Sequence, residues 1–282
     1  MSTILALLGS KRKLGNCDVL LSEAVEGAKE AGVRVDVLRL ADLNIETCRG
    51  CLSCVYKGTC AVTGDDMPRL IDKVLAADGL IVAAPTYLLS PTAVIKRACD
   101  RGLMLSPYLE KFSGRQRVAV TITVAGNARW NPLGVELLNQ FALAFGYRVL
   151  DYLEAYSPGP AEVLLQPEIP ERARELGRKV ALGLIQGITA RQAGETQCPI
   201  CYSRALRLDP DGSVTCPICL ARGNLVPTSA GHKILFDPES LKDHFWSPEH
   251  RRFHLADWIV PSRDKYLTNR PRLKELLAKY RN

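Results

Sequence analysis

Short apolar runs alternate with amphipathic stretches between residues 2 and 186. The apolar runs have strand-like patterns and lie at 2–8, 33–40, 79–84, 117–124 and 147–156. The amphipathic stretches have apolar residues at helical spacing and lie at 18–31, 66–76, 91–105, 132–145 and 169–186. A regular alternation of strands and helices is typical of a parallel sheet with helices on both faces.

Five predicted strands favour the flavodoxin-like, doubly wound order 2-1-3-4-5 within the α/β class. Ligands of such sheets bind beyond the carboxyl ends of the strands, so the loops there are the candidates for a site. After a predicted linker at 187–196, two Cys-Pro-Ile-Cys motifs mark a smaller unit. We therefore expect a flavodoxin-like domain at 1–190, with a compact cysteine loop at 48–60. The second region, 191–282, is expected to hold a zinc ribbon (197–227) and a C-terminal extension.

The composition favours metal or redox chemistry in a protein without a membrane span. The chain has 282 residues, of which 47% are hydrophobic, and no apolar run approaches the roughly 18 residues that span a bilayer. Residues 1–8 lack a basic flank and a cleavage site and are interpreted as a buried strand, which predicts a cytoplasmic location. Ten cysteines without an export signal indicate metal or redox sites rather than disulfides.

The segment after the first predicted strand has the residue types of a phosphate-binding loop. It reads Gly-Ser-Lys-Arg-Lys-Leu-Gly-Asn-Cys at 9–17 and leads into a helix. Backbone N–H groups at a helix start, small residues, and hydroxyl or basic donors suit a phosphate. The candidate residues are Ser10, Arg12, Gly15, Asn16 and Cys17. Taken alone, the loop also fits an ordinary strand–helix turn with exposed basic residues.

These residues resemble the Gly-Ser-x-Arg-x-x-Gly-Asn-Ser/Thr signature of the NADPH-dependent FMN reductase family, whose fold is flavodoxin-like. Cys17 replaces the usual hydroxyl residue, and a thiol is a weak donor, so main-chain N–H groups would have to compensate. The resemblance implies bound FMN and extends to the loops after the third and fourth strands. The matching residues there are Pro85, Thr86, Tyr87, Leu88, Ala125, Gly126 and Asn127. Tyr87 would stack on the flavin or hydrogen-bond to it, or is an ordinary surface tyrosine.

Four cysteines lie within one short loop after the second predicted strand. Cys48, Cys51, Cys54 and Cys60 have the spacing C-x2-C-x2-C-x5-C. A [4Fe–4S] cluster requires four thiolates, and the spacing resembles the iron–sulfur flavoprotein branch of the same family. That resemblance implies a [4Fe–4S] cluster beside FMN and a homo-oligomer. Metal-free thiols and zinc are the alternatives.

The second cysteine group consists of Cys198, Cys201, Cys216 and Cys219. Two CxxC pairs at this separation are typical of a metal site, and we expect structural Zn²⁺. Iron of the rubredoxin type is the alternative, although Tyr202 and Leu220 occupy positions where such knuckles usually carry glycine. The ribbon lacks the interleaved surface aromatics that stack bases, so a capping or oligomer-forming role is favoured over nucleic-acid binding.

The sequence predicts an FMN- and [4Fe–4S]-dependent oxidoreductase. It would transfer electrons between NAD(P)H or a ferredoxin-like donor and an acceptor, and no side chain stands out as a catalytic acid or base. Its partners would be a small-molecule substrate or an electron-carrier protein, within a homodimer or homotetramer. One alternative is an NAD(P)H:FMN or quinone reductase with a metal-free loop. A second is a redox-sensing flavoprotein that binds nucleic acid.

Overall fold

The computed structural model of the chain describes residues 2–112, 114–187, 190–229 and 231–280. Its main sheet has the order β2-β1-β3-β5-β6, with these strands parallel, and a short β4 pairs antiparallel with the end of β3. The strands are β1 (Thr3–Leu8), β2 (Arg34–Leu38), β3 (Gly79–Tyr87), β4 (Ser90–Pro91), β5 (Val118–Ala125) and β6 (Arg148–Tyr156). This order confirms the predicted flavodoxin-like fold.

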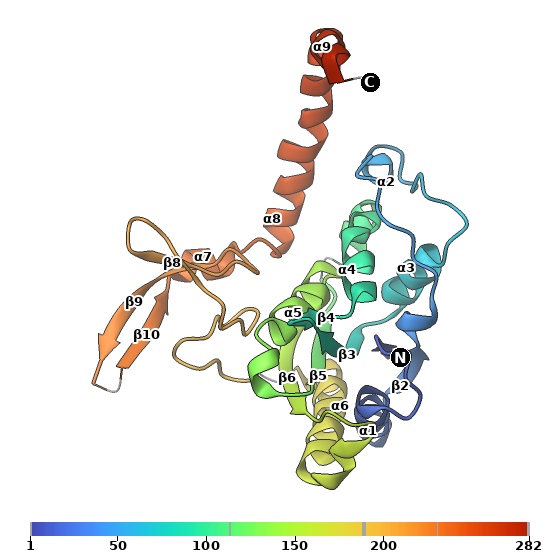
Figure 1. Ribbon diagram of the computed structural model, residues 1–282, viewed down its shortest axis with the longest axis vertical. Helices are drawn as coiled ribbons and strands as arrows, with labels where there is room; N and C mark the ends of the chain where they lie inside the picture. The colour runs from blue at the N-terminus through green and yellow to red at the C-terminus, as the bar shows by residue number, and fades with distance from the viewer. Residues whose placement is uncertain (1, 113, 188–189, 230, 281–282) are drawn as a thin grey trace.

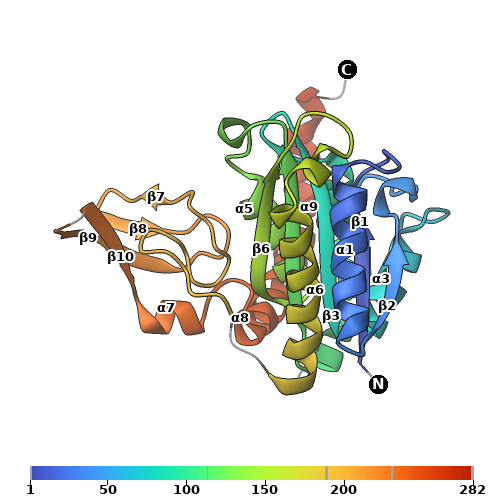
Figure 2. The same cartoon turned by 90° about the horizontal axis from the view of Figure 1, so that it is seen from below.

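Helices cover both faces of the sheet (Figure 2). One face carries α1 (Asn16–Glu30) and α6 (Glu168–Gln186), and the other carries α3 (Met67–Ala76), α4 (Ala93–Asp100) and α5 (Gly134–Ala144). β3 and β5 are buried along almost their whole length because apolar side chains leave them toward both layers. Each face therefore has its own hydrophobic core.

The helix predicted at 91–105 ends early, at Asp100. A 3₁₀ segment, η2 (Gly102–Phe112), follows it and contains Pro107, which cannot donate the hydrogen bond that an α-helix needs. The connections hold further short elements: η1 (Leu40–Asp42), α2 (Ser53–Tyr56), η3 (Ala128–Trp130) and η4 (Glu162–Leu165).

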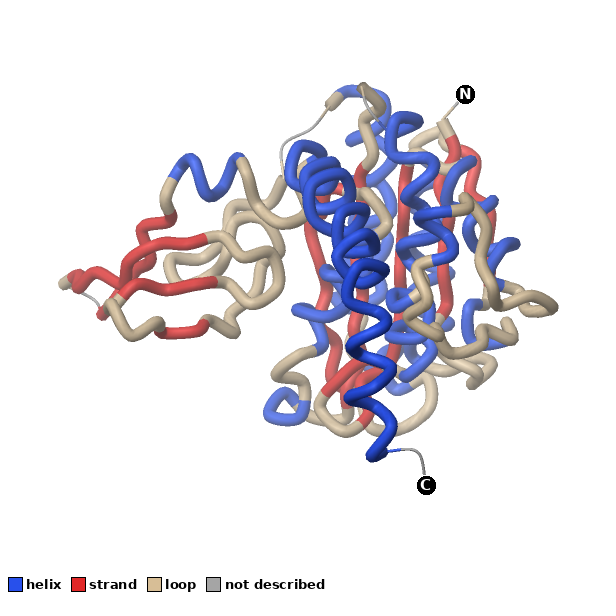
Figure 3. The backbone as a smooth tube through the Cα atoms, turned by 90° about the horizontal axis from the view of Figure 1, so that it is seen from above, coloured by secondary structure: helices blue, strands red, loops and turns tan. Residues whose placement is uncertain are grey.

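The C-terminal region forms an antiparallel four-stranded sheet followed by helices. The sheet has the order β10-β9-β8-β7, built from β7 (Arg207–Leu208), β8 (Ser213–Thr215), β9 (Arg222–Thr228) and β10 (Gly231–Phe236). After it come α7 (Pro238–Lys242), α8 (Pro248–Phe253), a π-helical turn (His254–Ile259), α9 (Val260–Leu276) and η6 (Leu277–Tyr280). Figure 1 shows α9 extending away from the main sheet. Figure 3 shows the small sheet to one side of the main sheet. Among the described residues, no helix is long and apolar enough to cross a membrane.

The two CxxC motifs join the small sheet to the core of the main domain. All four of their cysteines belong to the same buried cluster as α3, α4 and α5. Tyr202 is fully buried, and its hydroxyl donates to the carbonyls of Leu150 and Arg191. The side chain of Asn139 on α5 donates to the carbonyl of Cys201. The cysteine module and the main sheet thus share one hydrophobic core.

Two glycines allow α1 and α6 to cross in close contact. A Cβ at Gly177 would lie 1.8 Å from the carbonyl oxygen of Ala24, and one at Gly27 would lie 2.0 Å from that of Arg174. Gly102, by contrast, has no atom within 4 Å of its Cβ position and lacks a left-handed backbone.

We expect Gly177→Ala to force the two helices apart and to lower the free energy of unfolding by about 2 kcal/mol or more. Urea unfolding followed by circular dichroism measures the change, with Gly102→Ala as the matched control that should change it little. Equal stabilities of the two variants would contradict the close helix crossing.

Candidate functional site

The three predicted flavin loops meet at one edge of the sheet, beyond the carboxyl ends of β1, β3 and β5. Side chains connect them directly. The hydroxyl of Thr92 donates to the carbonyl of Gly9, which ties the second loop to the first. The hydroxyl of Thr86 lies 3.0 Å from that of Thr123 and 2.6 Å from Oδ1 of Asn131, which ties the second loop to the third.

The first loop leaves backbone donors available at the start of α1. Gly15 is the N-cap residue and has no side chain to satisfy the first N–H groups of the helix. Arg12 is exposed, and its aliphatic carbons lie close over Gly15. Ser10 is buried, with its hydroxyl accepting from the N–H of Arg12. Uncapped N–H groups beside an exposed guanidinium suit a phosphate.

Two of the predicted phosphate residues use their side chains elsewhere. Asn16 donates to the carbonyls of Ser157 and Gly159 and accepts from the N–H of Val163, so its amide holds the loop after β6. Cys17 is buried in the core, and burial, followed by the charge of Asp18, raises the pKa of its thiol to about 12. Only the main-chain N–H groups of these residues can face a phosphate.

The second loop is a tight hairpin between β3 and β4. Leu88 and Leu89 both have positive φ angles, of 48° and 70°, as a primed two-residue turn requires. Leucine adopts this region rarely, and such strain tends to persist at functional sites. Tyr87 and Leu88 are 58% and 99% exposed, so an apolar tip stands at the predicted flavin edge.

A polar network behind the loops contains a residue that the sequence did not single out. Asn131 is buried, accepts from Thr86 and Thr123, and donates to Glu154 of β6. The same carboxylate accepts from Tyr156 and from the guanidinium of Arg204. Asn131 precedes a proline in a loop, a context that carries no signal for such a role.

Arg204 extends this network toward the cysteine module. The main-chain N–H of Arg204 donates to the carboxylate of Glu136, which is fully buried on α5. The second carboxylate oxygen of Glu136 has no partner among the described residues. Burial raises the pKa of Glu136. A chain of polar contacts therefore leads from the flavin edge to the segment that follows Cys201.

A buried ion pair closes the base of the cysteine loop. The side chains of Arg101 and Asp65 are 1% and 0% exposed and hydrogen-bond to each other. Asp65 also accepts from the N–H groups of Glu46 and Met67, and Asp66 accepts from that of Asn44. Burial raises the pKa of Asp65, but the hydrogen bonds from Arg101 and Glu46 outweigh it and lower the pKa overall.

N–H donors reach two of the four loop sulfurs. The N–H of Gly50 donates to Sγ of Cys48, and Cys60 accepts from the N–H of Val62 and from Arg101, each over 3.4 Å. Burial, followed by the neighbouring Cys60 and then Cys48, raises the pKa of Cys54. Hydrogen bonds of this kind stabilise charged sulfur.

The loop thiols do not gather around the position of a single metal ion. Cys48 and Cys51 are exposed, and Cys54 and Cys60 are half-buried. The described residues contain one group of cysteine, histidine or acidic ligand atoms within 4.8 Å of one another, and it is the set of the two CxxC motifs. The C-terminal region also contacts the loop, since the hydroxyl of Tyr56 donates to the carbonyl of Ile259 over 2.9 Å.

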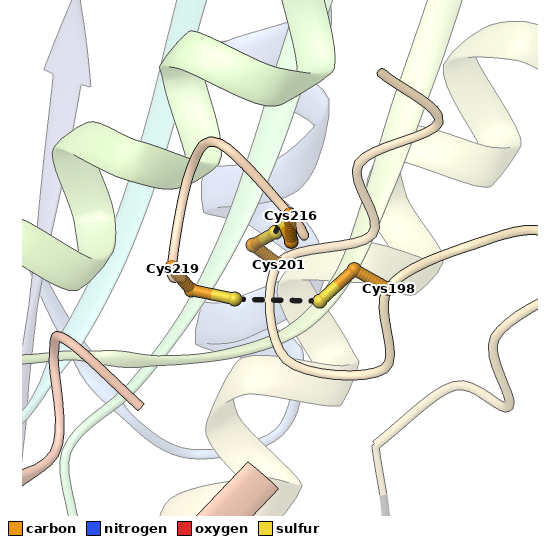
Figure 4. A group of neighbouring side chains, drawn as sticks. All are labelled: Cys198, Cys201, Cys216 and Cys219. Atoms are coloured by element: carbon orange, nitrogen blue, oxygen red, sulfur yellow. Dashed lines mark hydrogen bonds between the residues drawn. The ribbon is translucent and has the colours of Figure 1, made fainter. Parts of the chain in front are cut away.

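The CxxC sulfurs form a preassembled, fully buried tetrad (Figure 4). The pairs Cys198–Cys219 and Cys201–Cys216 are each separated by 3.4 Å between sulfurs. Tyr202 and Leu220, the residues after each motif, have left-handed φ angles of 57° and 62°. They take the conformation that glycine would adopt most easily, and the buried hydroxyl bonds of Tyr202 hold it there.

Comparisons with known proteins agree with this geometry. A sequence model of the NADPH-dependent FMN reductase family matches residues 2–153. An iron–sulfur flavoprotein from Archaeoglobus fulgidus is 31% identical over 175 residues, which cover 62% of this chain and 77% of that protein. One from Methanosarcina thermophila is 33% identical over 124 residues, covering 44% of this chain and 63% of the relative.

Two further similarities extend into the C-terminal region. A flavone synthase from Aspergillus candidus is 26% identical in an alignment of 253 residues that covers 77% of this chain and 76% of that protein. The solved structure of a flavone reductase superposes with a TM-score of 0.76 at 24% identity, covering 99% of this chain and 96% of the other. The latter establishes a shared fold for almost the whole chain.

Asp65→Asn would leave the charge of Arg101 buried without its partner, so we expect the free energy of unfolding at neutral pH to fall by about 3 kcal/mol or more. Because the folded pKa of Asp65 is lowered, this contribution is present above the unfolded pKa and is lost as the pH falls below about 4. Denaturation at several pH values measures it, with exposed Asp72→Asn as control. A pH-independent difference between wild type and Asp65→Asn would contradict the ion pair.

Cys198→Ser should loosen the main domain as well as the small sheet, because the tetrad lies in the shared core. We expect faster amide hydrogen exchange in α5 and β6, together with a loss of several kcal/mol of stability. Cys99→Ser, which leaves the tetrad intact, is the control. Exchange changes confined to residues 197–236 would show that the small sheet is energetically separate.

Proposed function

Because the chain belongs to the NADPH-dependent FMN reductase family, in its iron–sulfur flavoprotein branch, we propose that it is an FMN- and [4Fe–4S]-dependent oxidoreductase. It passes electrons between NAD(P)H or a ferredoxin-like donor and an acceptor. The observation that carries the proposal is the attachment of a four-thiol loop, with N–H donors at its sulfurs, to the fold of a flavin reductase.

The residues at the carboxyl edge of the sheet suit FMN. Arg12, the N–H groups at the start of α1 and the hydroxyl of Ser10 would hold the phosphate. The backbone of 85–88 and of 125–127 would flank the ring, and a Cβ at Gly126 would already be in ordinary contact with Pro158, 3.8 Å away. When bound, FMN supplies hydride acceptance and one-electron release, and the loops supply position and exclude water.

Cys48, Cys51, Cys54 and Cys60 would hold the cluster. The guanidinium of Arg101 and the N–H groups of Gly50 and Val62 would offset the charge on its sulfur ligands. The glycines at 50 and 58, with φ angles of 63° and 70°, give the loop the left-handed turns that wrapping a compact core requires.

The CxxC tetrad would hold structural Zn²⁺. Four buried sulfurs in a closed arrangement leave no position for a substrate, which is the character of a structural site. Its role would be to fix the small sheet, and the segment around Arg204, against the main domain.

The partners follow from the exposed apolar residues at the flavin edge. Leu88 and Trp130 are 99% and 63% exposed there. We assign this surface to a second copy of the chain, within a homodimer or homotetramer, and to the entry of a small-molecule substrate or electron carrier.

A second candidate is an NAD(P)H-dependent flavin reductase that acts on an organic substrate without a cluster. One observation favours it: the flavone synthase similarity covers 77% of this chain and so continues beyond residue 153, where the match to the family model ends. Its substrate class would be planar aromatic ketones or quinones.

Anaerobically purified protein should contain FMN, about four irons and about four acid-labile sulfides per chain, with zinc in addition. Cys51→Ser should lose the iron and sulfide yet keep the flavin, because Cys51 is exposed and has no structural hydrogen bond among the described residues. Metal, sulfide and flavin analyses measure this.

The control is Cys99→Ser, which should retain full iron. Yellow protein with zinc but without labile sulfide would remove the cluster and leave the second candidate. Colourless protein that binds no added FMN would remove both.

A further inference from the structure

A cavity of about 530 Å³ lies at the edge of the sheet opposite the flavin loops. It is bounded by the starts of β5 and β6, by η2, by the first CxxC motif and by the segment around α8. Arg117 and Arg148 stand at the starts of their parallel strands, so roughly 25 Å of strand separates them from the flavin edge. The cavity therefore serves neither the flavin nor the cysteine loop directly.

The lining of this cavity is strongly cationic, and the described residues contribute no carboxylate to it. Five arginines line it: Arg115, Arg117, Arg148, Arg251 and Arg252. Asp78 pairs with Arg115, and Glu110 and Glu249 pair with Arg252. Within the described ranges, no acidic oxygen lies within 4.0 Å of Arg117, Arg148 or Arg251. None of these three guanidinium groups therefore has a direct carboxylate partner there.

Arg117 is held rigidly. Its guanidinium lies between the rings of Phe112 and Tyr147, 4.2 and 3.9 Å from their centres. It donates to the carbonyls of Val74, Ala77 and Phe145 and is 4% exposed. Those carbonyls fix the charge at the back of the cavity without neutralising it.

Arg251 of α8 reaches the same part of the cavity, and its guanidinium keeps an N–H donor that no described residue accepts. Its Nε donates to the carbonyl of Trp246 and its Nη2 to that of Leu143, while its Nη1 donates to no acceptor in the described part of the chain. The Nη1 atoms of Arg117 and Arg251 lie 3.0 and 3.7 Å from the Cβ position of Gly146. Burial, followed by the charge of Arg117, lowers the pKa of Arg251 to about 10, so it is still charged at neutral pH.

Apolar side chains form most of the remaining walls, and Gln116, His244 and Ser247 are the polar residues among them. Leu109, Leu143, Val149 and Ile200 line the cavity together with the rings of Phe112 and Trp246. Guanidinium groups without a direct carboxylate partner, beside such walls, match a molecule with one anionic end and an apolar body.

We propose that this cavity binds an organic anion, a carboxylate or sulfonate with an apolar body. Its charged group pairs with Arg251 and Arg148, and its body lies against Trp246 and the aliphatic side chains. The bound molecule joins α8 to the starts of β5 and β6. The proposal is independent of the flavin and of the cysteine loop.

Calorimetric titration of the full chain with 1-naphthoate tests it. We expect a Kd below about 100 µM and at least about tenfold weaker binding of the neutral isostere 1-naphthalenemethanol. Arg251→Gln should weaken 1-naphthoate binding at least about tenfold, because a charge-assisted pair is lost. Arg34→Gln is the matched control, since Arg34 is exposed at the far edge of the sheet, on β2.

Arg148→Gln covers the case in which Arg251→Gln fails to fold, because Arg148 is exposed at the cavity rim. It should weaken binding about threefold. Absence of binding up to about 1 mM would overturn the proposal. So would equal affinity for the alcohol, unchanged affinity in both arginine variants, or full competition by equimolar inorganic phosphate.

Discussion

The parallel register of the central strands is the constraint on which the candidate site depends. Leu7 of β1 pairs with Leu38 of β2 and Val82 of β3, and Val82 pairs with Thr121 of β5. Because these strands run the same way, the loops after them must emerge at one edge. Hydrogen bonds between the loops, from Thr92 to Gly9 and from Thr86 to Asn131, then set their spacing more finely than the strands could.

The two cysteine groups are attached to this scaffold in different ways. The loop at 48–60 is fixed at its base by the buried Arg101–Asp65 pair, and its sulfurs lie at or near the surface. The CxxC tetrad is part of the core beneath α5, and Tyr202 anchors it to β6. An exposed set of thiols suits a group that exchanges electrons with the outside, whereas a buried tetrad suits one that maintains the fold. The Arg204–Glu154–Asn131 contacts join the second group to the flavin edge.

The fold could be predicted from the local pattern of apolar and polar residues, whereas much of the site could not. Strand–helix alternation predicted the strand order, and the spacing of the two CxxC motifs predicted their convergent tetrad. Hydrogen bonds between residues far apart in the sequence could not be predicted. Asp65 and Arg101 are 36 residues apart, and the side-chain amide of Asn16 donates to a carbonyl 141 residues away. The left-handed turn at Leu88–Leu89 could not be predicted either, because leucine rarely adopts a positive φ angle. The terminal helix α9 begins at Val260 and contains Pro271, although proline usually starts or breaks a helix.

We propose that one chain positions a flavin and an iron–sulfur cluster on neighbouring loops of the same sheet. Anomalous diffraction at the iron absorption edge, from crystals grown without oxygen, tests this most directly. The account predicts a peak of about four irons enclosed by residues 48–60 and flavin density bounded by 9–17, 85–90 and 125–131. An iron peak confined to the CxxC tetrad, or flavin density away from those three loops, would contradict it.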